Sequence, residues 1–203
     1  MKYTVLIDNG HGVDTAGKRS PLMDDGRRLM EYEFNRDVAS RLSELLQAVG
    51  VKPVLIVPEV NDISLTERAN RVKDYVRKHP DEKCVFVSIH GNASGNGAWM
   101  NAQGWSAWTT PGQNESDKLA ERLYDAFQPM LKDRKVLVNK ADGDRDWEAN
   151  FAVIRKAEIA CPSVLTENFF MDDKDDCAFM MSEQGRDRIA HAHMVGLLNY
   201  FFL

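Results

Sequence analysis

Apolar residues of this chain follow two kinds of pattern, which alternate along the sequence. Short apolar runs predict buried strands, and they lie at residues 3–7, 51–57, 84–89 and 163–166. Residues 105–109 alternate between larger and smaller side chains and predict another strand. Apolar residues that recur every three or four positions predict helices with one buried face, and they lie at residues 34–49, 65–76, 119–130 and 182–202. A further short strand is expected at residues 136–139, before a charged loop at 140–150.

Turn and capping residues separate these elements. Gly50 follows the first helix at a position where glycine commonly ends helices, and His79-Pro80 closes the second. The segment Ser64-Leu65-Thr66-Glu67 has the pattern of a capping box at a helix start. The sequence therefore predicts definite boundaries as well as the elements themselves.

Strands that alternate with helices are typical of an α/β fold with a largely parallel sheet. We expect a single domain over residues 1–203, in which a twisted, mostly parallel sheet is sandwiched between helices. Neither an internal repeat nor a linker interrupts the chain. The run 84–89 is the most apolar and belongs at the centre of the sheet, where both faces are covered. Such sheets bind ligands beyond the carboxyl ends of their strands.

Composition narrows the class of protein. A hydrophobic share of 43% and a charged share of 28% are ordinary for a globular protein. The net charge of −5, without a Lys/Arg block, gives no reason to expect a nucleic-acid partner. No run approaches the roughly 18 apolar residues of a membrane span, and the apolar run at the N-terminus is too short for a signal peptide. We expect no membrane insertion and a chain that is cytoplasmic as made.

The three cysteines, Cys84, Cys161 and Cys177, are odd in number and form no C-x-x-C pair. A disulfide framework or a cysteine-only zinc site is therefore not expected. We interpret them as reduced thiols, with Cys84 and Cys161 in apolar surroundings where a small buried residue fits.

Candidate chemistry lies at the ends of the predicted strands. His11, His90 and Glu167 each follow an apolar run, and Glu31 stands just ahead of the helix 34–49. Two imidazoles and one carboxylate are a common ligand set for a catalytic zinc ion, with one coordination position left open for water. The remaining carboxylate is then free to move protons. This arithmetic points to a metal-dependent hydrolase.

Each of these residues also has an ordinary structural explanation. A histidine after a strand is usually a loop residue, and an acid near a helix start can simply oppose the helix dipole. Glu33 competes with Glu31 for any role. Glu167 is more informative, because a carboxylate at that position is costly to bury without a metal or a donor. The chain has neither an H-E-x-x-H zinc signature nor a G-x-x-x-x-G-K-[ST] phosphate loop.

Four segments of the chain resemble, in the right order, the motifs of the zinc-dependent N-acetylmuramoyl-L-alanine amidases. This family includes bacterial cell-separation amidases and many phage and spore endolysins. The segments are Val5-Leu6-Ile7-Asp8-Asn9-Gly10-His11-Gly12, Glu31-Tyr32-Glu33-Phe34-Asn35-Arg36-Asp37-Val38-Ala39, Val87-Ser88-Ile89-His90-Gly91-Asn92-Ala93 and Val164-Leu165-Thr166-Glu167-Asn168-Phe169-Phe170. Residues 64–70 also resemble a Ser-Leu-x-x-Arg-x-x-x-Asn region of the family, slightly shortened.

The resemblance implies a role for each matched position. His11, Glu31 and His90 would be the zinc ligands, and Glu167 would take the place of the catalytic glutamate. Glu31 is preferred to Glu33 because the acid of the family stands four residues before the Asn that Asn35 matches.

The chain departs from the family pattern at three places. Asn9 stands where Pro is usual, Gly91 where Ala is usual, and residues 168–171 where a Leu-Gly-Phe-Leu-like run is usual. None of these departures removes a ligand. They bear on substrate detail more than on the chemistry.

The implied function is zinc-dependent hydrolysis of the amide between N-acetylmuramic acid and L-alanine in peptidoglycan, after export or release of the protein. Peptidoglycan is the only partner implied; no protein partner and no separate wall-binding domain are expected. Two alternatives stay open, namely a zinc hydrolase of another cell-wall amide and a non-catalytic wall-binding module of the same fold. Asn92 and Arg155 are weaker candidates for substrate contacts. Trp99, Trp105 and Trp108 either line a groove or belong to the core.

Overall fold

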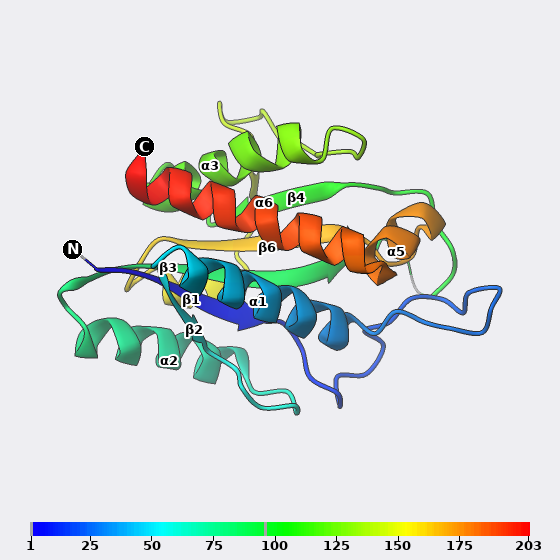
Figure 1. Ribbon diagram of the computed structural model, residues 1–203, viewed down its shortest axis with the longest axis horizontal. Helices are drawn as coiled ribbons and strands as arrows, with labels where there is room; N and C mark the ends of the chain where they lie inside the picture. The colour runs from blue at the N-terminus through cyan, green and yellow to red at the C-terminus, as the bar shows by residue number, and fades with distance from the viewer. Residues whose placement is uncertain (1, 96) are drawn as a thin grey trace.

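The computed structural model describes residues 2–95 and 97–203 as three layers, with a six-stranded sheet between two layers of helices (Figure 1). The strands are β1 (Lys2–Asn9), β2 (Lys52–Leu55), β3 (Glu82–Asn92), β4 (Trp105–Thr109), β5 (Trp147–Glu148) and β6 (Ser163–Phe170). The helices are α1 (Glu31–Ala48), α2 (Leu65–Lys78), α3 (Glu115–Met130), α4 (Ala152–Ala157), α5 (Lys174–Met181) and α6 (Glu183–Phe202).

The sheet has the strand order β2-β1-β3-β6-β4-β5 and is mostly parallel, as the sequence predicted. Strands β2, β1, β3 and β6 all run the same way, whereas β4 runs antiparallel to β6. β3 lies inside the sheet between β1 and β6, and its residues 84–89 are buried, which confirms the central position expected for the most apolar run. The carboxyl ends of β1, β3 and β6 therefore lie together at one end of the sheet. The carboxyl end of β4 lies at the opposite end.

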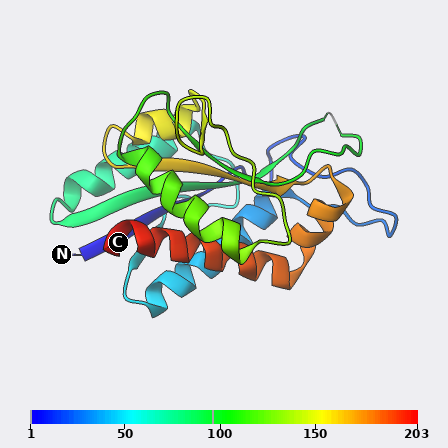
Figure 2. The ribbon, with the colours of Figure 1, turned by 90° about the horizontal axis from the view of Figure 1, so that it is seen from above.

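Two hydrophobic cores fill the space on the two faces of the sheet. The larger lies under α1, α3, α5 and α6, and it includes Phe34, Leu42, Leu123 and Ile189. The smaller lies under α2 and α4. Figure 2 shows this division, with α2 and α4 on one side of the sheet and α1, α5 and α6 on the other.

Several predicted boundaries are confirmed. Gly50 follows α1 with φ of +79°, a left-handed conformation that glycine adopts without strain. The side chain of Ser64 accepts a hydrogen bond from the Glu67 backbone and caps α2. The three cysteines are buried and free.

Other predicted boundaries are wrong. β3 and β6 extend past His90 and Glu167, so these two residues lie inside strands and do not follow them. Residues 136–139 make only an isolated bridge between Val136 and Trp105, and the predicted loop 140–150 contains the two-residue strand β5. Helices α4 and α5 were not predicted, because each has at most eight residues and shows too few turns for a periodic pattern.

The two ends of the chain lie side by side, away from the edge where β1 and β3 end (Figure 1). The Tyr3 ring is 4.9 Å from the Phe201 ring and 4.7 Å from the Phe202 ring, between centroids. Among the described helices, none is long and apolar enough to cross a membrane.

Candidate metal centre

His11 lies in the turn that follows β1. Its φ of +66° is left-handed, a conformation that is uncommon for residues other than glycine. Two side chains of α1 hold this turn: Asn35 Nδ2 donates to the Gly10 carbonyl at 2.9 Å, and Arg36 Nη1 donates to the His11 carbonyl at 3.0 Å. The segment 31–39 therefore fixes the backbone of the segment 5–12, and both belong to the motifs that resemble the family.

His90 lies near the end of β3, with its ring against Gly10. A Cβ atom on Gly10 would be 2.1 Å from His90 Cε1, so any side chain at that position would collide with the imidazole. The His11 and His90 rings are 4.9 Å apart between centroids and nearly perpendicular. Glycine is thus required at position 10 because the His90 ring lies so close to its backbone.

Glu31 opens α1 between the two imidazoles, with a side chain that is 1% exposed. Its Oε1 atom is 3.3 Å from His11 Nε2 and 3.2 Å from His90 Nδ1, and it also accepts a hydrogen bond from the Gly91 backbone. Burial opposes ionisation, but the two imidazoles outweigh it and hold the pKa of Glu31 well below its usual range. Glu33, the competing acid, is exposed and accepts a hydrogen bond from the Tyr32 hydroxyl.

The three side chains form a donor set that fits a divalent metal. One nitrogen or oxygen atom from each lies within 4.8 Å of the others. Within the described part of the chain, His11 Nε2 and Glu31 Oε2 are buried without a hydrogen-bond partner. Lys18 Nζ, 3.8 Å from Glu31 Oε2, is too far for a hydrogen bond. Buried polar atoms normally have partners, so these atoms suit a bound ion, and two imidazoles with a carboxylate suit zinc in particular.

Glu167 stands beside this donor set. It pairs with His90 in the register of β3 and β6, and in parallel strands paired residues present their side chains on the same face. Burial raises the pKa of Glu167 to about 7, with a further push from Glu31 and an opposing effect of His90. Its Oε2 atom is buried and has no hydrogen-bond partner among residues 2–95 and 97–203. A carboxyl in this state can exchange a proton near neutral pH.

Two groups that support the site were not identified from the sequence. Asn168 Nδ2 donates to the His90 carbonyl at 2.9 Å, and Asn168 Oδ1 accepts from Trp105 Nε1 at 3.1 Å, so this one side chain links β3, β6 and β4. In the sequence, residue 168 is notable only as part of a departure from the family pattern. A buried Asn directly after Glu167 was nevertheless a signal, since its amide needs partners.

The second supporting group is a buried ion pair beneath the histidines. Arg68 Nη1 pairs with Asp8 Oδ1, whose other oxygen accepts a hydrogen bond from Ser88 Oγ at 2.6 Å. Arg68 Nη2 pairs with Asp62 at 2.6 Å. The pair thus ties β1 and β3 to α2, and it gives the arginine of the Ser-Leu-x-x-Arg segment a structural role.

Two hollows lie near the carboxyl ends of the strands that carry the site, and one of them is lined by site residues. One, of about 170 Å³, is lined by Asp8, His11, Arg68 and His90 among others. The other, of about 430 Å³, lies between residues 17–22 and the loop after β3. His11 and His90 therefore adjoin the smaller hollow, whereas none of the four candidate site residues lines the larger one.

The weaker candidates are distributed differently. Trp105 is fully buried and stacks on Phe127 with 3.9 Å between ring centroids, so it belongs to the core. Trp108 packs against Trp147 of the neighbouring strand β5, near the carboxyl end of β4. Arg155 is exposed on α4, and in the described residues it makes no ion pair with Glu167.

Comparison with known proteins places this geometry in a family. A family model described as N-acetylmuramoyl-L-alanine amidase matches residues 5–199. N-acetylmuramoyl-L-alanine amidase LytC of Bacillus subtilis is 30% identical over 98% of this chain, which spans 35% of the length of that relative. An endolysin of Bacillus phage SPP1 is 26% identical over 97% of this chain and 65% of its own length.

Solved structures agree with the family match. An N-acetylmuramoyl-L-alanine amidase from Clostridium difficile 630 has a TM-score of 0.78 at 26% identity, over 98% of this chain and 97% of that one. Amidase AmiC2 of Nostoc punctiforme has a TM-score of 0.77 at 25% identity, over 99% and 98%. The segments that resembled the family in sequence are those that build the site. The chain therefore belongs to the N-acetylmuramoyl-L-alanine amidase family.

Proposed function

We propose that this protein hydrolyses the amide bond between the lactyl group of N-acetylmuramic acid and L-alanine in peptidoglycan. The observation that carries the proposal is the arrangement of two carboxylates around two histidines. Glu31 lies between the imidazoles, and Glu167 lies beside them with an oxygen that accepts no hydrogen bond from the described residues. Membership of the family and the activity for which its relatives are named support the choice of bond.

His11, Glu31 and His90 would hold a zinc ion in this proposal. Zinc bound there would supply a Lewis acid that polarises the scissile carbonyl and makes water more acidic. The chain itself prepares the ligands: α1 sets the turn that carries His11, Gly10 leaves space for the His90 ring, and the Gly91 backbone orients the Glu31 carboxylate.

Glu167 would act as the general base and then as the general acid. Its carboxylate takes a proton from the attacking water and returns it to the leaving amine of L-alanine, so that the proton balance closes within one turnover. Asn168 positions the strands on both sides of it by holding the His90 carbonyl and the Trp105 indole.

Digestion of purified sacculi tests the proposed bond. We expect new N-terminal alanine without new reducing sugar ends. Reducing ends without free amines would identify a glycosidase, and new amino groups on other residues would identify a hydrolase of a different wall peptide bond. Binding to sacculi without any release would identify a non-catalytic module, so each of these outcomes contradicts the proposal.

Metal content tests the ligand assignment separately. The purified protein should carry about one zinc ion per chain, and Glu31→Gln should lower that content because an amide is a poor substitute for a carboxylate ligand. Glu33→Gln is the matched control, since Glu33 is exposed and lies two residues away on α1. Full zinc content in Glu31→Gln and in His11→Ala, measured by elemental analysis, would show that other residues bind the metal.

A further inference from the structure

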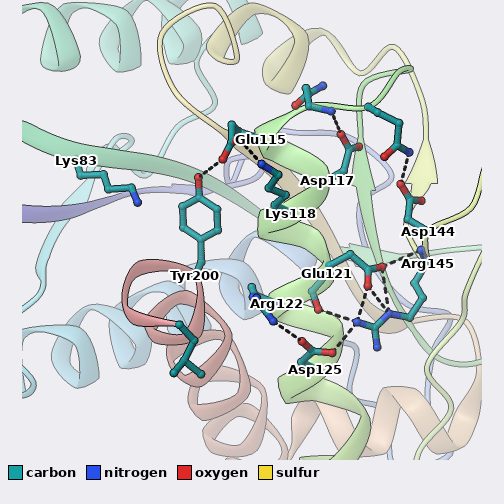
Figure 3. A pocket seen from close by; sticks show the side chains of 13 residues that line it. Lys83, Glu115, Asp117, Lys118, Glu121, Arg122, Asp125, Asp144, Arg145 and Tyr200 are labelled. Atoms are coloured by element: carbon teal, nitrogen blue, oxygen red, sulfur yellow. Dashed lines mark hydrogen bonds and ion pairs between the residues drawn. The ribbon is translucent and has the colours of Figure 1, made fainter.

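A second group of carboxylates lies at the end of the sheet opposite to the end that carries the histidines. Asp117 is in the first turn of α3, and Asp144 and Asp146 lie in the loop that leads into β5. Thr109, the last residue of β4, lies against them. Because β4 runs antiparallel to β6, this group is at the end of the sheet remote from Glu167. Asp117 and Asp144 also line a hollow of about 710 Å³ on that side (Figure 3).

The three carboxylates converge although two of them are almost fully buried. One oxygen from each lies within 4.8 Å of the others, with Asp146 0% exposed and Asp117 4% exposed. Asp117 accepts a hydrogen bond from the Asn114 backbone through Oδ2, and Asp144 accepts one from Gln113 Nε2 at 2.6 Å. Each of these bonds engages one oxygen of its carboxylate, so the second oxygen of Asp117 and of Asp144 is available to the group.

The centre of the group is short of positive charge and of hydrogen atoms. Asp144 Oδ1 and Asp146 Oδ1 are buried, and neither has a hydrogen-bond partner in the described ranges of the chain. The Thr109 hydroxyl carries one hydrogen, yet Asp146 Oδ2 is 2.5 Å from Thr109 Oγ1 and Asp117 Oδ1 is 3.1 Å from it. A single hydrogen cannot satisfy two acceptors fully. Buried carboxylate oxygens in this state are compensated either by a cation or by a proton, and burial together with Asp144 raises the pKa of Asp146 to about 7.

Nearby basic side chains do not supply that cation. Arg145 lies between the two loop aspartates in sequence, but its guanidinium turns away to Glu121 and Asp125 (Figure 3). Lys118 pairs with Glu115. In the portion of the chain that the structure describes, no Lys, Arg or His lies within ion-pair distance of Asp117, Asp144 or Asp146.

We propose that Asp117, Asp144 and Asp146 bind a calcium ion. Their donors are all oxygen, which hard cations such as Ca²⁺ prefer, whereas zinc favours nitrogen and sulfur. Ligands on opposite sides of Ca²⁺ lie about 4.6–5.2 Å apart, which accommodates the observed spread. Mg²⁺ usually retains several waters and takes only one or two carboxylates, so three converging carboxylates favour Ca²⁺.

Calcium at this position would fasten the loop 139–146 and the short strand β5 to α3. β5 pairs only through residues 147 and 148 with the end of β4, so this edge of the sheet has little backbone bonding of its own. The ion is thus a stabilising element at the sheet edge, separate from the proposed hydrolytic centre.

The test uses the full zinc-loaded protein in calcium-free buffer, titrated with CaCl₂ while the melting temperature is recorded. We expect a saturable rise, about 5–10 °C when Ca²⁺ exceeds its dissociation constant 100-fold. Terbium, a luminescent substitute for Ca²⁺, provides a direct binding readout, because Trp147 adjoins Asp146 and can transfer excitation energy to it. Neither readout depends on amidase activity.

Three variants decide whether the response belongs to this group. Asp146→Asn and Asp144→Asn should lose the calcium-dependent rise and the terbium signal. Asp142→Asn, an exposed acid of the same loop, should retain both. If Asp146→Asn does not fold, Asp144→Asn carries the comparison, since its side chain is only partly buried.

Three outcomes would overturn the site. The first is a wild-type protein whose melting temperature does not respond to Ca²⁺, and the second is a response that persists in both Asp144→Asn and Asp146→Asn. The third is stabilisation by Mg²⁺ without stabilisation by Ca²⁺. A wild type that ignores Ca²⁺ while Asp146→Asn melts higher would show that the carboxylates share a proton.

Discussion

The proposed hydrolytic centre contains two glutamate carboxyl groups whose pKa values differ. Burial acts against ionisation of both Glu31 and Glu167, yet their pKa values move in opposite directions. Glu31 contacts two imidazoles, whereas the pKa of Glu167 is affected by the single imidazole of His90 and by the carboxylate of Glu31. Two carboxyls with separated pKa values can hold different roles at one pH. The separation agrees with the roles proposed from the motifs and the geometry, which are metal binding for Glu31 and proton transfer for Glu167.

Replacement of Glu167 by Gln tests the proton-transfer role. We expect the rate to fall roughly 10²- to 10⁴-fold, because Gln keeps the shape of the side chain but has no basicity. Zinc content should be unchanged. The melting temperature above pH 7 should be equal or higher, since the buried charge is removed. Rate, zinc content and melting temperature are measured on one sample, and a stable, zinc-replete variant with near-normal turnover would refute the assignment.

Replacement of Gly10 by Ala tests the close approach of the His90 ring. The new Cβ would lie 2.1 Å from His90 Cε1, so the ring must move and zinc content should fall. Gly17→Ala is the control, because Gly17 has φ of +79° and open space around it. That variant should lose about 1 kcal/mol of stability from backbone strain alone and keep its zinc. Equal zinc contents in the two variants would contradict a specific role for Gly10.

At the scale of elements, the site depends on the register between β3 and β6. This register sets Glu167 opposite His90 and sets Asn168 where it reaches the His90 carbonyl. The next residue, Phe169, has φ of +70°, and the register between the strands shifts after His90. The irregularity follows directly after the residues of the proposed site, and such bulges are common beside active sites.

Asn168→Ala should destabilise this junction of strands. The substitution leaves the Trp105 indole N–H without its acceptor and the His90 carbonyl without its side-chain donor. We expect a loss of about 2–4 kcal/mol in the free energy of unfolding from urea denaturation. Asn61→Ala, which removes an exposed hydrogen bond to Asp14, should change it by less than about 0.5 kcal/mol. A loss below about 1 kcal/mol in Asn168→Ala would show that β4 and β6 are held by other contacts.

The sequence predicted long elements and their periodic faces better than short ones. The strand at 3–7 and the helix at 34–49 have many apolar positions in a regular pattern, and both are present. The helix α4 has six residues and β5 has two, so neither contains a full period from which it could be recognised.

Side chains at the site were predictable to different degrees. His11, Glu31 and His90 were named from their positions beside strands and helices and from the family motifs, and the structure brings them together. Glu31 could be separated from Glu33 only by alignment to Asn35, a choice that agrees with the burial of Glu31. Asp117 and Asp146 were not singled out, because aspartates at a helix start and in a charged loop have ordinary explanations and their convergence is a property of the fold.

At the scale of the whole molecule, α6 joins the larger core to the sheet. Gly196 allows the backbones of α6 and α3 to approach closely, since a Cβ there would be 2.8 Å from Leu123 Cα. His193 of α6 is fully buried, with Nε2 3.0 Å from Thr166 Oγ1 and Nδ1 2.9 Å from the Ile189 carbonyl. Both ring nitrogens have partners, and a neutral imidazole satisfies them by donating at one nitrogen and accepting at the other.

His193 should make the fold less stable in mild acid. Burial lowers the pKa of His193 to about 4, whereas the unfolded chain has a value of about 6.5. The unfolded state therefore binds more protons between pH 6.5 and pH 4, and the free energy of unfolding falls as the pH is lowered through that range. The contribution of His193 should drop by about 2 kcal/mol between pH 7 and pH 5.

Urea unfolding at pH 7 and pH 5 measures this effect as a difference between variants. His193→Gln should show a smaller loss of stability in acid than the wild type does. His191→Gln is the control, because His191 is exposed on the same helix and should leave the pH dependence unchanged. Identical pH dependence in wild type and His193→Gln would place the acid sensitivity elsewhere.

The adjacent chain ends have a consequence for how this fold is combined with other modules. Tyr3 packs against Phe201 and Phe202 at the end of the sheet away from His11 and His90. A module tethered through either terminus would therefore lie at the end of the sheet that carries the termini. The end that carries His11 and His90 would stay free. The length of such a tether would set how far the domain can move from its anchor. It would not change which end of the sheet the domain presents to a polymer strand. Fusion at the start or at the end should be equivalent in this respect.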